Sequence, residues 1–167
     1  MALAGLRPVV EMRVIDFALC AMDEIVNQAA KNRFMFGGQG RVPLVARLPI
    51  GIWSASAAQH SQSLEAWFAH LPGVAVVTPA TPQDNFSLLK ASLASGDPVI
   101  YMEQKGLYYS LSGEVPEGDH IVPIGKAAVR REGSDATVIA TGAMVGLALT
   151  VAERLAGEGI SLEVVDP

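Results

Sequence analysis

Cysteine and long apolar runs are both scarce in this sequence of 167 residues. The single cysteine, Cys20, allows no internal disulfide, which fits a reducing compartment such as the cytoplasm. Its apolar neighbours predict that it is a small core residue on a helix. No run of about 18 apolar residues occurs, so no segment is expected to cross a membrane. The first six residues also lack the charged and apolar regions of a signal peptide.

Positive charge is also limited. There are 12 Lys and Arg against 17 Asp and Glu, which gives a formal net charge of −5. Without a basic cluster, this balance argues against nucleic acid and against an anionic membrane surface as partners. Only 17% of the residues are charged, whereas 50% are apolar. The excess of apolar residues predicts extensive burial, either inside a parallel sheet or at a subunit interface.

Strand and helix patterns alternate along the chain. Strands are expected at 8–12, 42–47, 74–78, 99–103, 122–129, 136–141 and 162–165, and helices at 17–30, 64–70, 82–95 and 145–156. Segments such as Val74–Val77 are apolar on both faces, which is typical of a parallel sheet covered by helices. The fold class expected is therefore α/β. Residues 104–120 are irregular and rich in Gly, Glu and Pro, which predicts a linker between units 1–118 and 119–167. The second unit has too few strands to close a core of its own.

Three local signals refine this outline. Asp16 is expected to cap the helix at 17–30, and Thr81 the helix that begins at Pro82. The latter helix is expected to bury one apolar face, made of Phe86, Leu89 and Leu93. Three glycines at 37, 38 and 40 follow a helix and precede a strand. A nucleotide-binding glycine turn has the opposite order, so these residues predict a plain turn and disfavour a Rossmann-type nucleotide binder.

One histidine has a suggestive position. His60 follows a loop of small residues, 51–58, and precedes the predicted helix at 64–70. If it lies at the helix N-terminus, the positive end of the dipole disfavours imidazolium and leaves a neutral ring for proton transfer. A single loop histidine is more often structural, so its surroundings must decide between the two interpretations.

Several longer motifs resemble one enzyme family. The stretch QHSQSLEAWFAH at 59–70, followed by PG at 72–73 and VVTP at 76–79, resembles the beta subunit of thiamine-diphosphate-dependent 2-oxo acid dehydrogenases, with the pyruvate and acetoin members closest. Four further motifs agree: GLRPVVE at 5–11, GGQ at 37–39, GEVPE at 113–117 and IGKA at 124–127. The resemblance implies a pyrimidine-binding domain at 1–118 that lacks its N-terminal strands. It implies the linker and the beginning of a transketolase C-terminal domain at 119–167.

The resemblance also implies roles for particular residues. Phe17 matches the aromatic residue that packs against the aminopyrimidine of the cofactor, although a plain core Phe is an equal alternative. His60 matches the histidine at the mouth of the substrate channel, where it would assist acyl transfer to lipoamide. A structural potassium ion in some members corresponds to the oxygen atoms of Leu44, Ser92, Leu93, Ser95 and Asp97.

Two regions depart from the family pattern, and one expected residue has no match. Arg13, Val14 and Ile15 replace residues that are usually Met or aromatic near the cofactor, and Arg13 either faces a carboxylate or breaks the site. Trp53 stands in a loop that is glycine-rich in relatives, which predicts a narrower channel or an exposed or interface aromatic. The family's glutamate that hydrogen-bonds the aminopyrimidine has no match here, because Glu11 lies inside a strand.

Two functions follow from the resemblance. The first is an enzyme subunit that pairs with an alpha subunit, which holds the cofactor diphosphate through magnesium, and with a second beta subunit. Such an assembly would decarboxylate a 2-oxo acid or cleave acetoin and pass the acyl group to a lipoyl-bearing acyltransferase. The second is a truncated, catalytically inactive assembly module of the same fold.

Overall fold

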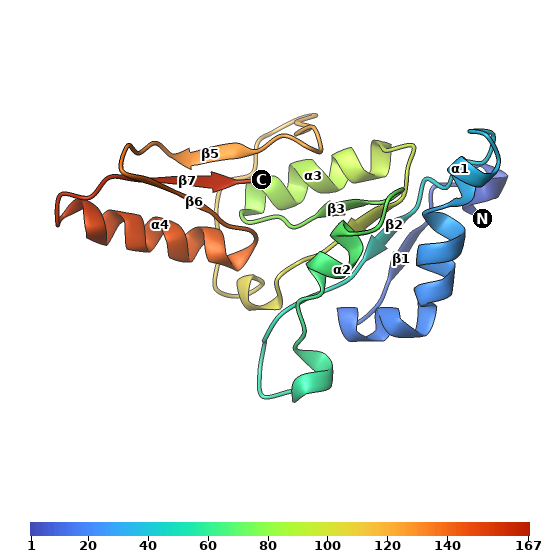
Figure 1. The fold of residues 1–167 in the computed structure, drawn as a ribbon, viewed down its shortest axis with the longest axis horizontal. Helices are drawn as coiled ribbons and strands as arrows, with labels where there is room; N and C mark the ends of the chain where they lie inside the picture. The colour runs from blue at the N-terminus through green and yellow to red at the C-terminus, as the bar shows by residue number, and fades with distance from the viewer.

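The computed structural model describes residues 1–167 and arranges them as two units (Figure 1). The first unit holds a four-stranded parallel sheet in the order β1-β2-β4-β3. Its strands are β1 (Val9–Glu11), β2 (Val45–Arg47), β3 (Ala75–Val77) and β4 (Val99–Tyr101). The second unit holds a three-stranded sheet in the order β5-β7-β6. Its strands are β5 (Ala128–Arg131), β6 (Ala136–Ile139) and β7 (Leu162–Asp166).

Helices of three kinds connect these strands. The α-helices are α1 (Asn32–Met35), α2 (Glu65–Ala69), α3 (Pro82–Ala94) and α4 (Ala143–Ala156). Short 3-10 helices cover Ala2–Ala4, Ile15–Ala21, Ala58–His60 and Lys105–Leu107, and a π-helix covers Asp23–Ala29. No helix has the length and apolar character needed to cross a membrane.

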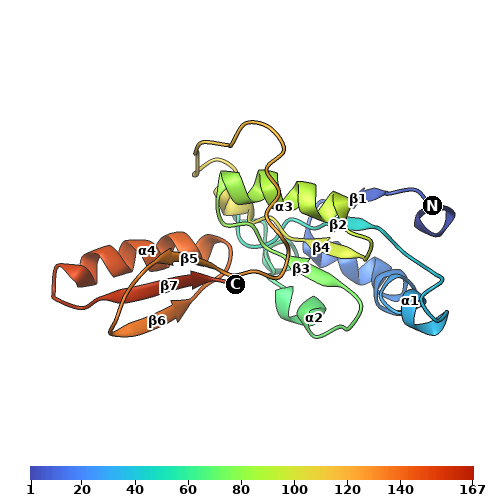
Figure 2. The ribbon, with the colours of Figure 1, turned by 90° about the horizontal axis from the view of Figure 1, so that it is seen from above.

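Helical segments cover both faces of the first sheet, and Figure 2 shows α3 and α2 on opposite sides of it. On one face, the segment 15–29 and α2 pack against the sheet around Phe68 and Ile100. On the other face, Leu88 and Leu89 of α3 pack against Tyr101 and its neighbours. This layered arrangement confirms the expected α/β class with a parallel sheet flanked by helices.

The expected α-helix at 17–30 is instead a 3-10 helix followed by a π-helix. Its apolar spacing explains the difference, because Ile15, Ala18 and Ala21 recur every three residues and all face the core. Residues three apart share one face in a 3-10 helix. Phe17 and Cys20 therefore point outward, so the prediction that Cys20 lies in the core is wrong.

Capping predictions had mixed outcomes. Thr81 caps α3 as expected, since its side-chain oxygen accepts a hydrogen bond of 3.1 Å from the backbone N–H of Asp84. Asp16 makes no cap, because its side chain is buried and is bonded elsewhere. The expected apolar face of α3 is also only partly buried: Phe86 and Leu93 are 36% and 39% exposed. Glycines 37 and 38 form a turn with positive φ after α1, as expected.

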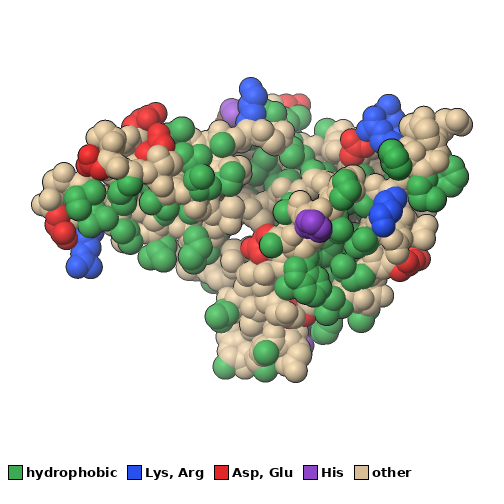
Figure 3. Space-filling view, in the orientation of Figure 1, with side chains coloured by type: hydrophobic (Ala, Val, Ile, Leu, Met, Phe, Trp, Pro, Cys, Tyr) green, Lys and Arg blue, Asp and Glu red, His purple; other side chains and the backbone are tan.

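The second unit is covered on one face by α4, which packs against β7. β5 runs antiparallel to β7, although only parallel strands were expected. β5 also begins at Ala128 rather than at 122, because Ile124 packs against the core of the first unit. The outward side of α4 leaves Met144, Leu147 and Val151 exposed, and hydrophobic side chains are visible over this helix in Figure 3.

Candidate active site

A cavity of about 500 Å³ opens at the carboxyl ends of β1 and β2. Ligands of open α/β sheets bind at this edge of the sheet. The cavity is lined by Glu11, Arg13, Val14, Arg47, Pro49, Trp53, Ser56, His60, Lys105, Tyr108 and Tyr109. It therefore brings His60 together with three of the residues that depart from the family pattern, Arg13, Val14 and Trp53.

Strand pairing brings these segments side by side. In register, Glu11 lies beside Arg47, and Arg47 lies beside Tyr101 of β4. The pairing continues beyond β2 and β4, because an isolated parallel bridge joins Ile50 to Gln104. The chain turns away at Gly51, which has a φ of 79° and whose added Cβ would lie 2.1 Å from the side chain of Gln104. The positive φ would strain any residue with a side chain there, and the end of the Gln104 side chain would have to shift to make room.

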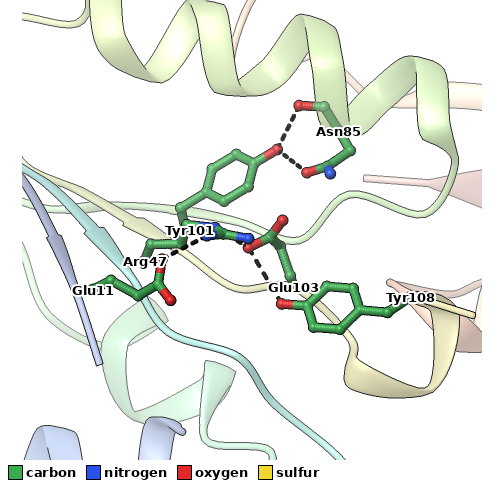
Figure 4. Close-up of polar contacts among 6 residues, drawn as sticks. All are labelled: Glu11, Arg47, Asn85, Tyr101, Glu103 and Tyr108. Carbon is green, nitrogen blue, oxygen red and sulfur yellow. Dashed lines mark hydrogen bonds and ion pairs between the residues drawn. The ribbon is translucent and has the colours of Figure 1, made fainter. Parts of the chain in front are cut away.

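An ion-pair cluster forms one wall of the cavity (Figure 4). The guanidinium of Arg47 donates to the carboxylate of Glu11 at 2.6 Å and, through Nε, to the carboxylate of Glu103. Glu103 is only 4% exposed, so this pairing replaces the contacts with water that its carboxylate loses on burial. The hydrogen bond to Glu103 is the main cause that raises the pKa of Arg47.

Two tyrosines flank this cluster. The hydroxyl of Tyr108 donates to Glu103 at 3.5 Å, and burial together with that carboxylate raises the pKa of Tyr108 to about 12. The hydroxyl of Tyr101 donates to the carbonyl and side-chain oxygens of Asn85 at 2.8 and 2.7 Å. Burial raises the pKa of Tyr101 as well. Tyr101 thereby ties the interior strand β4 to α3.

His60 is the last residue of the 3-10 turn Ala58–His60, and α2 begins only at Glu65. The prediction that His60 lies at a helix N-terminus is therefore wrong, and the dipole argument for a neutral ring does not apply. The turn is closed by the hydroxyl of Ser61, which donates to the carbonyl of Ala57 at 2.9 Å. Ala57 has a φ of 65° and a ψ of 175°, a conformation that strains any residue except glycine. The Nδ1 atom of His60 is buried and has no hydrogen-bond partner.

Two buried charged residues hold the segment around His60. The Nζ of Lys105 donates to the carbonyl of His60 at 2.5 Å, and Lys105 is only 5% exposed. Burial lowers the pKa of Lys105, while the charge of Asp16 opposes that shift. One carboxylate oxygen of Asp16 accepts a hydrogen bond of 2.7 Å from the side chain of Gln62, and the other is buried without a partner.

Sequence reasoning missed Lys105, Arg47 and Glu103. Lys105 falls in the stretch 104–120 that the sequence predicts to be a linker, and lysine is seldom buried. Its position just after a buried strand was the one available signal, because the carboxyl ends of parallel strands carry ligand sites.

Phe17 lies beside His60. The two ring centroids are 5.4 Å apart, and the ring planes meet at 84°, an edge-to-face contact. Phe17 is 42% exposed, so its ring is not a plain core residue. The structure thus brings together the two residues that the family resemblance assigns to cofactor and substrate.

The expected cation positions lie at the amino ends of β2 and β4, away from His60. The carbonyl oxygens of Leu93 and Ser95 accept hydrogen bonds of 3.0 and 2.6 Å from the guanidinium of Arg7. The carboxylate of Asp97 pairs with Arg33 at 2.5 Å. The remaining two carbonyl oxygens accept backbone hydrogen bonds: Leu44 from Val99 at 2.8 Å and Ser92 from Ser95 at 3.2 Å. No group of three or more His, Cys, Asp or Glu side chains is placed to hold a metal ion.

Fold and cavity together define an α/β protein with a histidine-bearing site at the carboxyl edge of a parallel sheet. Residues 1–110 match the model of the transketolase pyrimidine binding domain, and residues 125–167 match that of the transketolase C-terminal domain. The chain therefore belongs to the transketolase pyrimidine binding domain family, and the family resemblance inferred from its motifs is confirmed.

Curated relatives are named as beta subunits of three related enzymes. The chain is 47% identical over 165 residues to acetoin:2,6-dichlorophenolindophenol oxidoreductase subunit beta of Cupriavidus necator, covering 99% of this chain and 48% of the relative. It is 47% identical to 2-oxoisovalerate dehydrogenase subunit beta of Bacillus subtilis, with coverages of 99% and 50%. It is 46% identical to a mitochondrial pyruvate dehydrogenase E1 beta subunit of Oryza sativa, with coverages of 99% and 45%. The chain thus spans about half the length of these relatives.

Solved structures agree on the fold. A chain described as a split gene transketolase, inactive beta4 tetramer, superimposes with a TM-score of 0.78 at 25% identity, covering 99% of this chain and 50% of that one. A transketolase of Pichia stipitis gives a TM-score of 0.72 at 19% identity, covering 96% of this chain and 22% of that one. The second likeness shows the fold alone.

Proposed function

We propose that this chain is the beta-subunit part of a thiamine-diphosphate-dependent enzyme. The reaction is oxidative decarboxylation of a 2-oxo acid such as pyruvate, or cleavage of acetoin, with transfer of the acyl group to lipoamide. One observation carries the proposal: His60 lines a cavity of about 500 Å³ at the carboxyl edge of a sheet of the pyrimidine binding family. The relatives named as acetoin, 2-oxoisovalerate and pyruvate enzymes support the same class of reaction.

The residues beside His60 fit an aromatic cofactor ring. Phe17 keeps 42% of its surface exposed next to the imidazole, which leaves an apolar ring free to pack against an aminopyrimidine. His60 offers a buried Nδ1 that lacks a partner within the chain. When bound, thiamine diphosphate supplies an electron sink for the bond that breaks.

This chain contributes a proton-transfer group and a shaped cavity. The imidazole of His60 would donate or accept a proton at the substrate oxygen during acyl transfer. Lys105 and Asp16 would act as positioning residues, because they bond to the backbone of His60 and to the side chain of Gln62. The stacked rings of Trp53 and Tyr109, 6.2 Å apart, would limit the entry of water and of large substrates.

The proposal includes partners that complete the enzyme. An alpha subunit would hold the cofactor diphosphate through magnesium, a second beta subunit would complete a heterotetramer, and a lipoyl-bearing acyltransferase would take the acyl group. A cytoplasmic location of the enzyme would agree with the free thiol of Cys20. The boundary between the two domains would fall near residue 118. Potassium at the five cation positions would require Arg7 to withdraw from the carbonyl oxygens of Leu93 and Ser95.

A second candidate is an assembly module without catalysis. The observation that favours it is that Glu11, the one carboxylate that lines the cavity, is already paired with Arg47, so the cavity offers no free carboxylate to an aminopyrimidine.

Reconstitution separates the two candidates. The chain is mixed with an alpha subunit, thiamine diphosphate and magnesium, and substrate-dependent reduction of a dye is measured beside acyl transfer to lipoamide. We expect His60→Ala to lower acyl transfer by about a hundredfold or more. His70→Ala is the matched control, because His70 is exposed at the end of α2 and lies outside the cavity. A stable complex without turnover favours the assembly module, and turnover that survives in His60→Ala contradicts the role of His60.

A further inference from the structure

Three cationic side chains line the cavity, and two of them are already engaged. Arg47 is bonded to two carboxylates, one of which is buried. The ammonium of Lys105 is bonded to the carbonyl of His60. Arg13 makes no hydrogen bond and no ion pair within the chain, so its charge remains available.

The surroundings of Arg13 leave it free to meet a ligand. It lies two residues beyond Glu11 of β1 on the same cavity wall, but the carboxylate of Glu11 is occupied by Arg47 at 2.6 Å. Glu103, which lies behind Arg47 and does not line the cavity, is also paired with Arg47. The cavity thus contains one uncompensated guanidinium and an imidazole. A guanidinium presents a planar fork of donors that matches a carboxylate.

We propose that Arg13 determines specificity by binding the carboxylate of a 2-oxo acid, so that this cavity favours 2-oxo acids over uncharged acetoin. The inference rests on the proposed function and adds the class of substrate. A volume of about 500 Å³ accommodates a small acid beside a cofactor ring. One free cation suits a carboxylate monoanion better than a phosphate dianion, which would leave charge unpaired.

Ligand binding tests this inference without turnover. Trp53 lines the same cavity, and the only other tryptophan is Trp67 on α2. In a Trp67→Phe background, the fluorescence of Trp53 is titrated with pyruvate, with acetoin and with inorganic phosphate. We expect Arg13→Met to weaken pyruvate binding about tenfold to a hundredfold, which is the range for losing a charge-assisted hydrogen bond. Acetoin binding is expected to stay unchanged, and Arg13→Lys to restore part of the pyruvate affinity.

A matched control isolates the position of the charge. Arg41→Met removes the same charge from an exposed arginine outside the cavity and should leave pyruvate binding unchanged. The inference is overturned if Arg13→Met weakens acetoin equally, if it changes neither ligand, if phosphate binds more tightly than pyruvate, or if pyruvate does not bind.

Reconstituted enzyme distinguishes this inference from the proposed function. Arg13→Met should raise KM for pyruvate with kcat nearly unchanged, since the contact acts on binding. If pyruvate binds through Arg13 but no turnover occurs, the proposed function fails and the carboxylate site stands. If turnover occurs with an unchanged preference between pyruvate and acetoin, only the role of Arg13 fails.

Discussion

The two units of this chain each hold one arginine between two carboxylates, but the space beside the two clusters differs. Arg47 pairs with Glu11 and Glu103 beside a cavity of about 500 Å³. Arg130 of β5 pairs at 2.5 Å with Asp84 of α3 and at 2.7 Å with Asp166 of β7, beside a cavity of about 80 Å³. The first cluster faces space for a ligand, whereas the second joins the two units. Buried ion pairs alone therefore do not mark a functional site.

The covering of the two sheets differs as well. The first sheet is packed on both faces, and Phe68 of α2 is fully buried against it. The second sheet has α4 on one face, and the outward side of that helix leaves Leu147 56% exposed. The free energy of folding should therefore be concentrated in the first unit.

The largest effect that we expect is at Phe68. Phe68→Ala should lower the free energy of unfolding by about 3–5 kcal/mol, because it removes a fully buried ring and leaves a cavity. Leu147→Ala on α4 should change it by less than about 0.5 kcal/mol, because that side chain is mostly exposed. Denaturant unfolding of both variants measures the contrast.

Phe68→Leu covers the case in which the alanine variant does not fold. It keeps most of the apolar volume and should cost clearly less than the alanine variant. Equal losses at Phe68 and Leu147 would contradict the view that the first unit holds most of the stability.

A smaller effect is expected at the joint between the units. Burial opposes the charge of Arg130, but its hydrogen bonds to both carboxylates outweigh burial and raise its pKa. Arg130→Met would leave Asp84 and Asp166 buried without a cation. Because the Arg130 side chain is 23% exposed, we expect a loss of about 1–3 kcal/mol rather than the full cost of a buried pair.

Arg130→Met should also uncouple the two units. Near-ultraviolet and far-ultraviolet circular dichroism should then give separate unfolding midpoints, where the wild type gives one. A coincident transition with unchanged stability would show that the apolar contact of Ile124 with the first core, rather than this ion pair, holds the units together.

The order of strands and helices could be predicted from the sequence because apolar periodicity and turn residues are local signals. Thr81 is an example: its capping oxygen and Pro82 act within one turn of α3. The prediction of an α-helix over residues 17–30 was wrong because a spacing of three and a spacing of 3.6 residues differ little over so short a helix. As a consequence, Cys20 was wrongly predicted to be buried, and the exposure of Phe17 was not expected.

The site could be predicted only in part. His60 and Phe17 were found through the family resemblance, and their contact needed the fold. Arg47 and Glu103 are 56 residues apart in sequence, and only the register of β2 and β4 brings them together. Antiparallel β5 was missed for the same reason, because pairing direction depends on distant partners rather than on the strand itself.

Alkaline pH should act on the Arg47 cluster rather than on the joint, because all three tyrosines lie in the first unit. The pKa of Tyr108 is raised to about 12 by burial and by Glu103, so the folded state holds this proton more tightly than the unfolded chain does. Its contribution to stability is therefore complete below the ordinary tyrosine pKa of about 10 and is lost as the pH rises through about 12. Because Tyr108 is 42% exposed, we expect a loss of only about 1 kcal/mol.

Between about pH 9 and pH 12, the stability advantage of the wild type over Tyr108→Phe should shrink by that amount, as followed by denaturant unfolding. A constant advantage across this range would show that the phenol of Tyr108 ionises no differently in the folded and unfolded states.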